Sequence, residues 1–176
     1  MELLNYEVLK KSGYEGYILE SAPEKVMQFG EGNFLRAFVD YWFDVANEKA
    51  GWNGKCVLVQ PIPQGLTSMI NAQEGLYTLY LRGRENGEKA DRKRVISSVS
   101  RCVNPYEKEG FDAMMELAVS DDLEYIVSNT TEAGIVYDPE CRMEDEPCSS
   151  FPGKLTQVLY ARYKAGKSGL VILSCE

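Results

Sequence analysis

The chain has 176 residues, which favours a single domain, and its 44% hydrophobic and 26% charged residues are typical of a globular protein. Its 19 basic and 27 acidic side chains give a net charge of −8, which argues against a nucleic-acid-binding domain with its usual basic surface. No stretch approaches the ~18 apolar residues of a membrane span or forms a signal peptide, and the absence of histidine excludes a His-based triad.

The first third of the chain follows a strand–helix–strand pattern. After a polar lead-in with some helical character over residues 1–22, the apolar run 25–29 predicts a strand that ends at Gly30. Residues 34–46 carry apolar side chains at helical spacing in two stripes, so we expect a helix buried on two sides. The apolar run 55–60 predicts the next strand, and a unit of this length implies that the two strands pair in parallel.

The middle of the chain has the pattern of an antiparallel hairpin. Residues 76–82 and 95–103 alternate in polarity or are β-branched, which predicts two strands joined by the polar segment 83–88. Seven Lys and Arg residues lie between positions 82 and 101, mixed with acidic side chains. We therefore expect a solvated hairpin and not a basic binding surface.

The last third returns to alternating helices and strands. Helices are predicted over residues 111–119 and from Pro152, buried strands over 124–128 and 170–174, and an acidic loop over 138–150. The chain is therefore predicted to be α/β, with a mostly parallel sheet, helices on both faces and an inserted antiparallel hairpin. Such a sheet binds its ligand just past the carboxyl ends of its strands. Because the chain ends where such a loop should begin, we expect the sheet to be incomplete.

The junction between the first strand and the first helix, residues 30–37 (GEGNFLRA), carries the clearest chemical signal. Gly30 permits a tight turn, and Gly32 lets the backbone approach a diphosphate that faces the N–H groups and the dipole of the helix start. Leu35 stands where the dinucleotide fingerprint has its third glycine, so Ala37 has to supply the close helix–strand contact. The alternative is a glycine turn that serves only packing.

Two polar side chains close to this turn are candidate ligand contacts. Arg36 is a cation in the first helical turn, where it opposes the helix dipole unless an anion lies nearby; the alternative is an ion pair with Asp40 or Glu31. Gln60 ends the second strand, where an acidic residue is usual. Gln60 could bond a ribose hydroxyl but would not repel a 2′-phosphate, so the spacing alone does not choose between NAD and NADP.

Three further candidates, Thr130, Thr131 and Glu132, come directly after the strand predicted over residues 124–128. At that edge of the sheet the hydroxyls could reach a ribose or the nicotinamide, and Glu132 could move protons. The alternative is a helix-capping turn, because Thr and Glu are also capping residues.

The five cysteines, at positions 56, 102, 141, 148 and 175, are odd in number and show no C-x-x-C spacing. This pattern argues against a zinc ribbon or a thioredoxin-type motif. We expect free thiols, no metal site and a cytoplasmic protein. A disulfide between Cys141 and Cys148, at the ends of the acidic loop, is an open alternative.

Three sequence blocks resemble the long-chain mannitol dehydrogenase family: residues 28–38 (QFGEGNFLRAF), residues 128–134 (SNTTEAG), and the stretch from FPGKLT at 151–156 to SCE at 174–176. The resemblance spans nearly the whole chain from about residue 24 onward. It implies that residues 1–176 are a truncated, NAD-binding, Rossmann-type N-terminal domain, without the mostly helical catalytic domain of the family. The candidate cofactor-binding residues are Val26, Met27, Gln28, Phe29, Gly30, Glu31, Gly32, Asn33, Phe34, Leu35, Arg36, Ala37, Gln60, Thr130, Thr131 and Glu132.

The resemblance also implies zinc-independent hydride transfer between NAD and a small sugar acid or polyol, with the sugar-acid branch as the better match. The lysine, asparagines and histidine that carry out catalysis in the family lie beyond the position matching Glu176. We therefore expect no catalytic residue in this chain, no turnover by it alone, and self-association through an exposed sheet edge. The sequence is also compatible with a polyol dehydrogenase, with a non-catalytic dinucleotide-binding module, and with an α/β module that binds no ligand.

Overall fold

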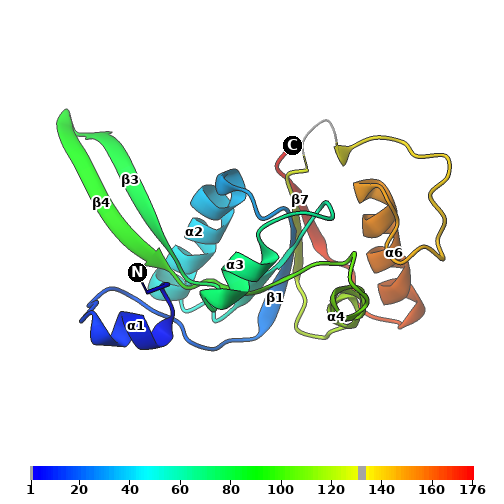
Figure 1. The fold of residues 1–176 in the computed structure, drawn as a ribbon, viewed down its shortest axis with the longest axis horizontal. Helices are drawn as coiled ribbons and strands as arrows, with labels where there is room; N and C mark the ends of the chain where they lie inside the picture. The colour runs from blue at the N-terminus through cyan, green and yellow to red at the C-terminus, as the bar shows by residue number, and fades with distance from the viewer. Residues whose placement is uncertain (1, 131–133) are drawn as a thin grey trace.

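A parallel sheet of five strands forms the centre of the protein, and helices cover both of its faces (Figure 1). The computed structural model describes residues 2–130 and 134–176. The strands are β1 (Glu24–Phe29), β2 (Lys55–Val59), β5 (Val99–Val103), β6 (Tyr125–Ser128) and β7 (Val171–Ser174). The helices are α1 (Tyr6–Lys11), α2 (Asn33–Ala50), α3 (Thr67–Ala72), α4 (Lys108–Ala118) and α6 (Phe151–Lys164).

The sheet order is β5-β2-β1-β6-β7, and every neighbouring pair is parallel. From β1 the chain first adds strands on one side, β2 and then β5, and later adds β6 and β7 on the other side. The direction therefore reverses between β1 and β6, which end together because Phe29 is in register with Ser128. A reversal of this kind opens a crevice at the carboxyl ends of the strands, where doubly wound sheets bind ligands.

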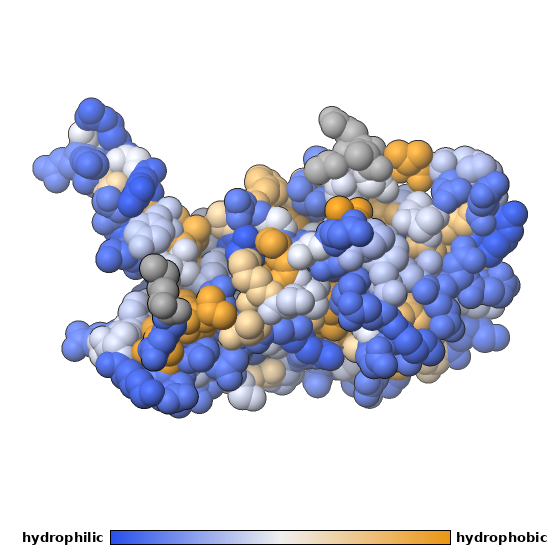
Figure 2. Space-filling view, viewed as in Figure 1, coloured by the Kyte–Doolittle hydropathy of each residue, from blue (hydrophilic) through white to orange (hydrophobic). Residues whose placement is uncertain are grey.

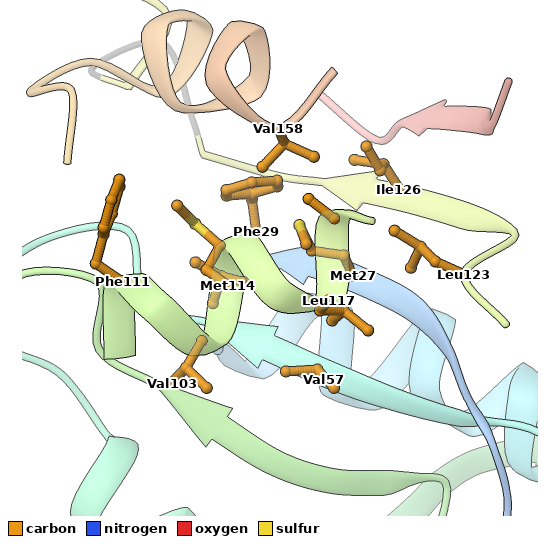
Figure 3. Close-up of a cluster of buried hydrophobic side chains, with 12 residues drawn as sticks. Met27, Phe29, Val57, Val103, Phe111, Met114, Leu117, Leu123, Ile126 and Val158 are labelled. Atoms are coloured by element: carbon orange, nitrogen blue, oxygen red, sulfur yellow. The ribbon is translucent and has the colours of Figure 1, made fainter. Parts of the chain in front are cut away.

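Alternate side chains of β1 anchor the helices on opposite faces of the sheet. Val26 packs with Leu35 and Val39 of α2 in one buried cluster. Met27 and Phe29 belong to the cluster on the other face, which Figure 3 shows between the sheet and helices α4 and α6. Because β1 and β2 are covered on both faces, their sequences are nearly continuous apolar runs, and this is why they could be predicted.

The hairpin differs from the prediction in its boundaries. β3 (Tyr77–Glu85) and β4 (Glu88–Ile96) pair with each other, so most of the predicted joining segment is strand. Asn86 and Gly87 form the tip, both with positive φ (52° and 85°), as a two-residue hairpin turn requires. Val99–Val103, predicted as the end of the hairpin, is instead β5 of the parallel sheet. Figure 2 shows mostly hydrophilic side chains over the projecting hairpin.

Two predictions of burial are wrong. Only one side of α2 is buried, whereas Phe34, Phe38 and Trp42 on its other stripe are 54%, 48% and 57% exposed. Strand β7 is exposed along its whole length. It is the edge strand and pairs only with β6 among the described strands, and an open groove separates it from α2. The short helix α3 was not predicted. No helix in the described part of the chain is both long and apolar enough to cross a membrane.

Candidate functional site

A cleft of about 810 Å³ opens at the carboxyl edge of the sheet, over the ends of β1 and β6. Its volume lies in the range of ~300–1,000 Å³ that is common for ligand sites. The turn after β1 contributes Gly30, Glu31, Gly32, Asn33 and Phe34 to its lining. The other lining residues are Pro61, Ile62, Tyr106, Asn129, Thr130, Gly134, Val136, Tyr137, Asp138, Pro139, Ser149, Ser150 and Phe151.

Gly30 makes the tight turn out of β1. Its φ is +120°, a conformation that L side chains rarely adopt, and its N–H donates to the carbonyl oxygen of Val59 at 3.1 Å. A Cβ atom at this position would lie 3.1 Å from the carbonyl oxygen of Asn129 and 3.2 Å from Cδ1 of Leu35. The backbone conformation therefore demands glycine, as the sequence predicts, and the close neighbours leave little room for a side chain.

Gly32 is surrounded by open space. A Cβ atom built there would meet no heavy atom of the described residues within 4 Å, so no packing contact within the protein requires a glycine. Gly32 is the N-cap of α2 and supplies no side-chain cap. The first backbone hydrogen bond across this end of the helix runs from the N–H of Arg36 to the carbonyl oxygen of Gly32, at 3.3 Å.

The three N–H groups at the start of α2 precede that bond. Those of Asn33, Phe34 and Leu35 cannot bond within the helix, and they have no hydrogen-bond acceptor among residues 2–130 and 134–176. Asn33 and Phe34 line the cleft. A helix N-terminus with unpaired donors beside open space fits an anionic group such as a diphosphate.

Glu31 lies between the two glycines and is 6% exposed. Burial raises the pKa of its carboxyl group, although backbone N–H donors and the charge of Arg36 act in the opposite direction. Its Oε1 accepts a hydrogen bond from the N–H of Leu66 at 3.4 Å. The carboxyl group therefore connects this turn to the loop after β2.

Arg36 makes neither of the ion pairs considered from the sequence in the described part of the chain. Its Nη2 donates to Oδ1 of Asn33 at 2.7 Å, and its guanidinium lies 5.3 Å from the centroid of the Tyr77 ring. Arg36 does not line the cleft, whereas Asn33 does. Its side chain is therefore held beside the first turn of α2 and contacts the cleft only through Asn33.

Asp40 supports α2 from the protein interior and is fully buried. Burial raises the pKa of its carboxyl group to about 7, against the opposing effects of a hydrogen bond from Tyr77 and the charge of Arg36. The Tyr77 hydroxyl lies 3.2 Å from Oδ2 of Asp40 and donates to the carbonyl oxygen of Arg36 at 2.7 Å. The first two turns of α2 are thus held against Tyr77 of β3 by a buried polar contact.

The side-chain amide of Gln60 is bonded within its own loop. Its Nε2 donates to the carbonyl oxygens of Ile62 at 2.8 Å and Pro63 at 3.0 Å, and its Oε1 accepts from the Thr67 hydroxyl at 2.8 Å. Gln60 is 2% exposed and does not line the cleft. The loop that Gln60 holds in place contributes Pro61 and Ile62 to the cleft instead. Because both ends of the Gln60 amide are already bonded within this loop, the amide is not free for the ribose contact expected from the sequence.

The remaining candidates differ in where the structure places them. Val26, Met27, Phe29 and Leu35 are core residues that are at most 2% exposed, so they position the turn without reaching the cleft, and Ala37 is exposed. Gln28 is buried beneath the turn and donates from Nε2 to the carbonyl oxygen of Gly30 at 3.1 Å. Thr130 lines the cleft, and its N–H donates to Oε2 of Glu176 at 3.0 Å. Thr131 and Glu132 lie outside the described residues.

The sequence reasoning missed the opposite wall of the cleft. Tyr106 follows β5 and donates its hydroxyl hydrogen to the carbonyl oxygen of Pro61 at 2.9 Å. Ser150 caps α6, and Phe151 packs edge to face on Phe29 with ring centroids 5.3 Å apart. Their positions in the sequence could have indicated them, because these residues also follow a predicted strand or begin a predicted helix at the carboxyl edge of the sheet.

Comparison with known proteins gives a family and several relatives. The sequence model of the family described as "Mannitol dehydrogenase Rossmann domain" matches residues 24–176. An altronate oxidoreductase from Phocaeicola vulgatus is 44% identical over 180 residues, which cover 100% of this chain and 36% of that protein. An altronate oxidoreductase from Bacillus subtilis is 45% identical over 172 residues, which cover 96% of this chain and 35% of that protein. The chain thus spans about a third of the length of these curated relatives.

Two solved structures share the fold. Pseudomonas fluorescens mannitol 2-dehydrogenase, in a ternary complex with NAD and D-mannitol, has a TM-score of 0.81 at 21% identity, over 99% of this chain and 38% of that one. A D-sorbitol dehydrogenase in substrate-free form has a TM-score of 0.74 at 19% identity, over 99% of this chain and 39% of that one. These likenesses confirm the predicted fold class, a parallel Rossmann-type sheet with an added antiparallel hairpin.

Proposed function

Because the chain belongs to the mannitol dehydrogenase family, we propose that it is the NAD-binding part of an oxidoreductase that interconverts tagaturonate and altronate by hydride transfer, in hexuronate catabolism. The match over residues 24–176 supports the cofactor, and the relatives named altronate oxidoreductase support the substrate. In this proposal residues 1–176 form the N-terminal nucleotide-binding domain. A mostly helical catalytic domain completes the enzyme.

One observation carries the proposal of a dinucleotide site: the open, uncapped helix start at Gly32, placed where the strand order reverses between β1 and β6. The N–H groups of Asn33 and Phe34 would donate to the diphosphate, and the absence of a Cβ at Gly32 would leave room for it. The cleft continues toward Ile62 on one side and Thr130 on the other, which gives an extended dinucleotide two directions to occupy.

When bound, the dinucleotide would supply the hydride that reduces a substrate carbonyl or accept one from an alcohol. The part of this chain is to bind the diphosphate and to orient the nucleotide across the carboxyl edge of the sheet. Gly30 and Gln28 hold the turn, and Asn33 fixes Arg36 beside it. None of these side chains exchanges a proton with substrate in this account.

We further propose that residues 1–176 do not turn over substrate alone. The chain has no histidine and spans about a third of its curated relatives, so the acid–base groups of the reaction would come from elsewhere in the enzyme. Purified chain mixed with tagaturonate and NADH should show no loss of NADH absorbance above the enzyme-free rate. Steady oxidation by pure chain that is lost in the Gly32→Val variant would contradict this.

Two other classes of function are alternatives to this one. A mannonate oxidoreductase or a mannitol-type polyol dehydrogenase would use the same nucleotide domain, and the solved relative that binds D-mannitol favours keeping this option. A non-catalytic dinucleotide-binding module would bind NADH without pairing with a hydride-transfer domain. Assays of the complete enzyme with tagaturonate, fructuronate and fructose separate the enzyme options, and absence of turnover with all three would favour the non-catalytic one.

The test of the nucleotide site is a fluorescence titration of the chain with NADH. Wild type should bind one NADH per chain, and Gly32→Val should weaken binding at least about 100-fold, or ~3 kcal/mol, because the branched side chain fills the diphosphate position. Gly83→Val is the matched control, because Gly83 is also surrounded by open space and lies in the distant strand β3. Equal binding by wild type and Gly32→Val would reject the site.

We also propose that the isolated chain self-associates through the groove between α2 and β7. Phe38 and Trp42 form one side of the groove, and Ile172 and Leu173 the other, and all four are between 39% and 57% exposed. The outer edge of β7 pairs with no described strand, which leaves backbone donors and acceptors for a second copy. Light scattering should show a dimer or larger species that Ile172→Asp converts to monomer, and a monomeric wild type would exclude it.

The proposed location is the cytoplasm. All five cysteines are free thiols in the structure, which fits a reducing compartment. Fractionation of cells that express the complete enzyme should recover it with cytoplasmic markers, and recovery in a periplasmic or secreted fraction would contradict this location.

A further inference from the structure

A second cluster of reactive side chains lies outside the nucleotide turn, in the loop between β6 and α6. The Sγ atoms of Cys141 and Cys148 and a carboxylate oxygen of Asp145 all lie within 4.8 Å of one another. Cys148 is 2% exposed, whereas Cys141 and Asp145 are half-buried. A segment of only eight residues thus brings three potential ligand atoms close together.

The two sulfur atoms rest on bare backbone at the first turn of α6. A Cβ atom at Gly153 would lie 2.7 Å from Sγ of Cys141 and 3.1 Å from Sγ of Cys148. The Ser150 side chain caps this helix end by accepting from the N–H of Gly153 at 3.2 Å. The absence of a side chain at Gly153 therefore lets both sulfur atoms approach the same place.

The loop is held in shape by one buried glutamine, Gln157, which is 3% exposed. Its Oε1 accepts from the N–H of Cys148 at 3.0 Å, and its Nε2 donates to the carbonyl oxygens of Asp145 at 2.6 Å and Met143 at 3.1 Å. The backbone at two of the three converging residues is thus fixed by the same amide. Such prior ordering reduces the entropy that a ligand would have to offset.

The charges around the cluster also fit a cation held by thiolates. Lys154 is 1% exposed, bonds only to the Tyr106 hydroxyl and the Ser149 carbonyl oxygen, and has no carboxylate partner among the described residues. The thiol of Cys148 now donates to the carbonyl oxygen of Arg142 at 3.0 Å.

We propose that Cys141, Asp145 and Cys148 bind a thiophilic divalent cation of the zinc class, with the fourth tetrahedral position left to water. Two thiolates and one carboxylate around a divalent cation leave a net charge of −1, which the Lys154 ammonium group balances. Sulfur ligands disfavour magnesium and calcium, which prefer all-oxygen sites. Binding releases the two thiol protons, so the affinity should rise with pH.

The sequence reasoning expected no metal because it looked for histidine and C-x-x-C pairs. The C-x₃-D-x₂-C spacing here matches neither pattern, and only the fold of the loop brings its three members together. The proposal does not depend on the nucleotide site, since none of the three residues lines the cleft.

The experiment is a titration of the reduced protein with Co²⁺, followed by competition with Zn²⁺. Wild type should bind one Co²⁺ per chain with thiolate charge-transfer absorption and the visible bands of tetrahedral cobalt, and Zn²⁺ should abolish both. Cys141→Ser and Cys148→Ser should each lose the charge-transfer band, and Asp145→Asn should weaken binding at least roughly tenfold. Gly153→Ala keeps all three ligands but displaces the sulfur atoms, so it should also weaken binding.

Cys175→Ser is the matched control, because Cys175 is likewise half-buried but lies beyond β7, and it should bind Co²⁺ like wild type. Far-ultraviolet circular dichroism and urea denaturation of each variant show whether the fold is retained. The absence of tetrahedral cobalt bands in reduced wild type, or their persistence in Cys141→Ser, would overturn the proposal. The proposal would also be overturned if Cys141 and Cys148 form a disulfide in air and the protein, once this bond is reduced, binds no metal.

Discussion

The turns after β1 and β2 leave neighbouring parallel strands at the same edge of the sheet, where Phe29 is in register with Val59. After β1, Gly32 faces open space and the start of α2 has no side-chain cap. After β2, the Gln60 side chain uses both ends of its amide to bond the loop that follows. Equivalent positions at the sheet edge thus differ in what they leave available to a ligand.

The difference shows why a position at the carboxyl edge does not by itself make a binding residue. A polar side chain there first satisfies the backbone groups of its own loop, because burying them unpaired would cost stability. A glycine brings no side chain to satisfy them, so the backbone donors of the next helix stay open. Substitutions at these two turns and beneath α2 test this contrast.

The two glycines of the first turn should differ greatly in the stability that a valine substitution costs. Gly30→Val should lower the free energy of unfolding by roughly 3–4 kcal/mol, because the side chain meets a φ of +120° and close contacts with Asn129 and Leu35. Gly32→Val should change it by less than about 0.5 kcal/mol. Urea denaturation of both variants measures this, and equal losses of stability would remove the contrast between the two glycines.

The buried carboxyl group beneath α2 should make stability fall as pH rises. The pKa of Asp40 is raised from 3.8 to about 7 in the folded protein, so the folded state holds the proton more tightly than the unfolded state. Stability is therefore lost between about pH 4 and pH 7 and changes little above it. Asp40→Asn should remove this loss and gain roughly 4 kcal/mol at pH 8 relative to its effect at pH 4, at ~1.4 kcal/mol for each unit of the pKa shift. A pH-independent effect in denaturation would contradict the buried, protonated state.

Gln60→Ala should affect the fold and spare the ligand. Loss of its bonds to Ile62, Pro63 and Thr67 should lower the free energy of unfolding by about 1–2 kcal/mol. NADH affinity should stay within about threefold of wild type, or ~0.7 kcal/mol, since the side chain does not line the cleft. A tenfold loss of affinity with unchanged stability would restore the ribose contact expected from the sequence.

The smallest expected effect is that of Arg36→Met. Its guanidinium is held by Asn33 and the Tyr77 ring and contributes no lining to the cleft, so NADH affinity should change by less than about threefold. Titrations at low and high salt check this. A tenfold weakening at low salt that disappears at high salt would show that Arg36 pairs with the diphosphate.

The sequence allowed the central part of this fold to be predicted, because β1, α2 and β2 carry apolar patterns that burial on the sheet imposes. The boundary between β4 and β5 was missed because Val95–Val103 alternates in polarity or is β-branched, and so reads as one strand. The break lies at buried Ser97, whose N–H and hydroxyl both bond to Oδ1 of Asp44 on α2. That contact joins residues 53 positions apart, and no local pattern shows it.

The candidate site was predictable to a similar extent. The glycine turn was found because its spacing and its strand–helix context are local. The hydrogen bonds that occupy Gln60 and the placement of Tyr106 against Pro61 depend on how separate loops pack, and single-sequence reasoning does not determine that. The exposed face of β7 was missed because an apolar run looks the same in an edge strand and in a central one.

The most direct measurement of the central claim is a crystal structure of the chain with NADH. We expect the diphosphate oxygens to lie within hydrogen-bond distance of the N–H groups of Asn33 and Phe34, in the open space over Gly32. A diphosphate bound anywhere else on the protein, with this helix start left to solvent, would contradict it.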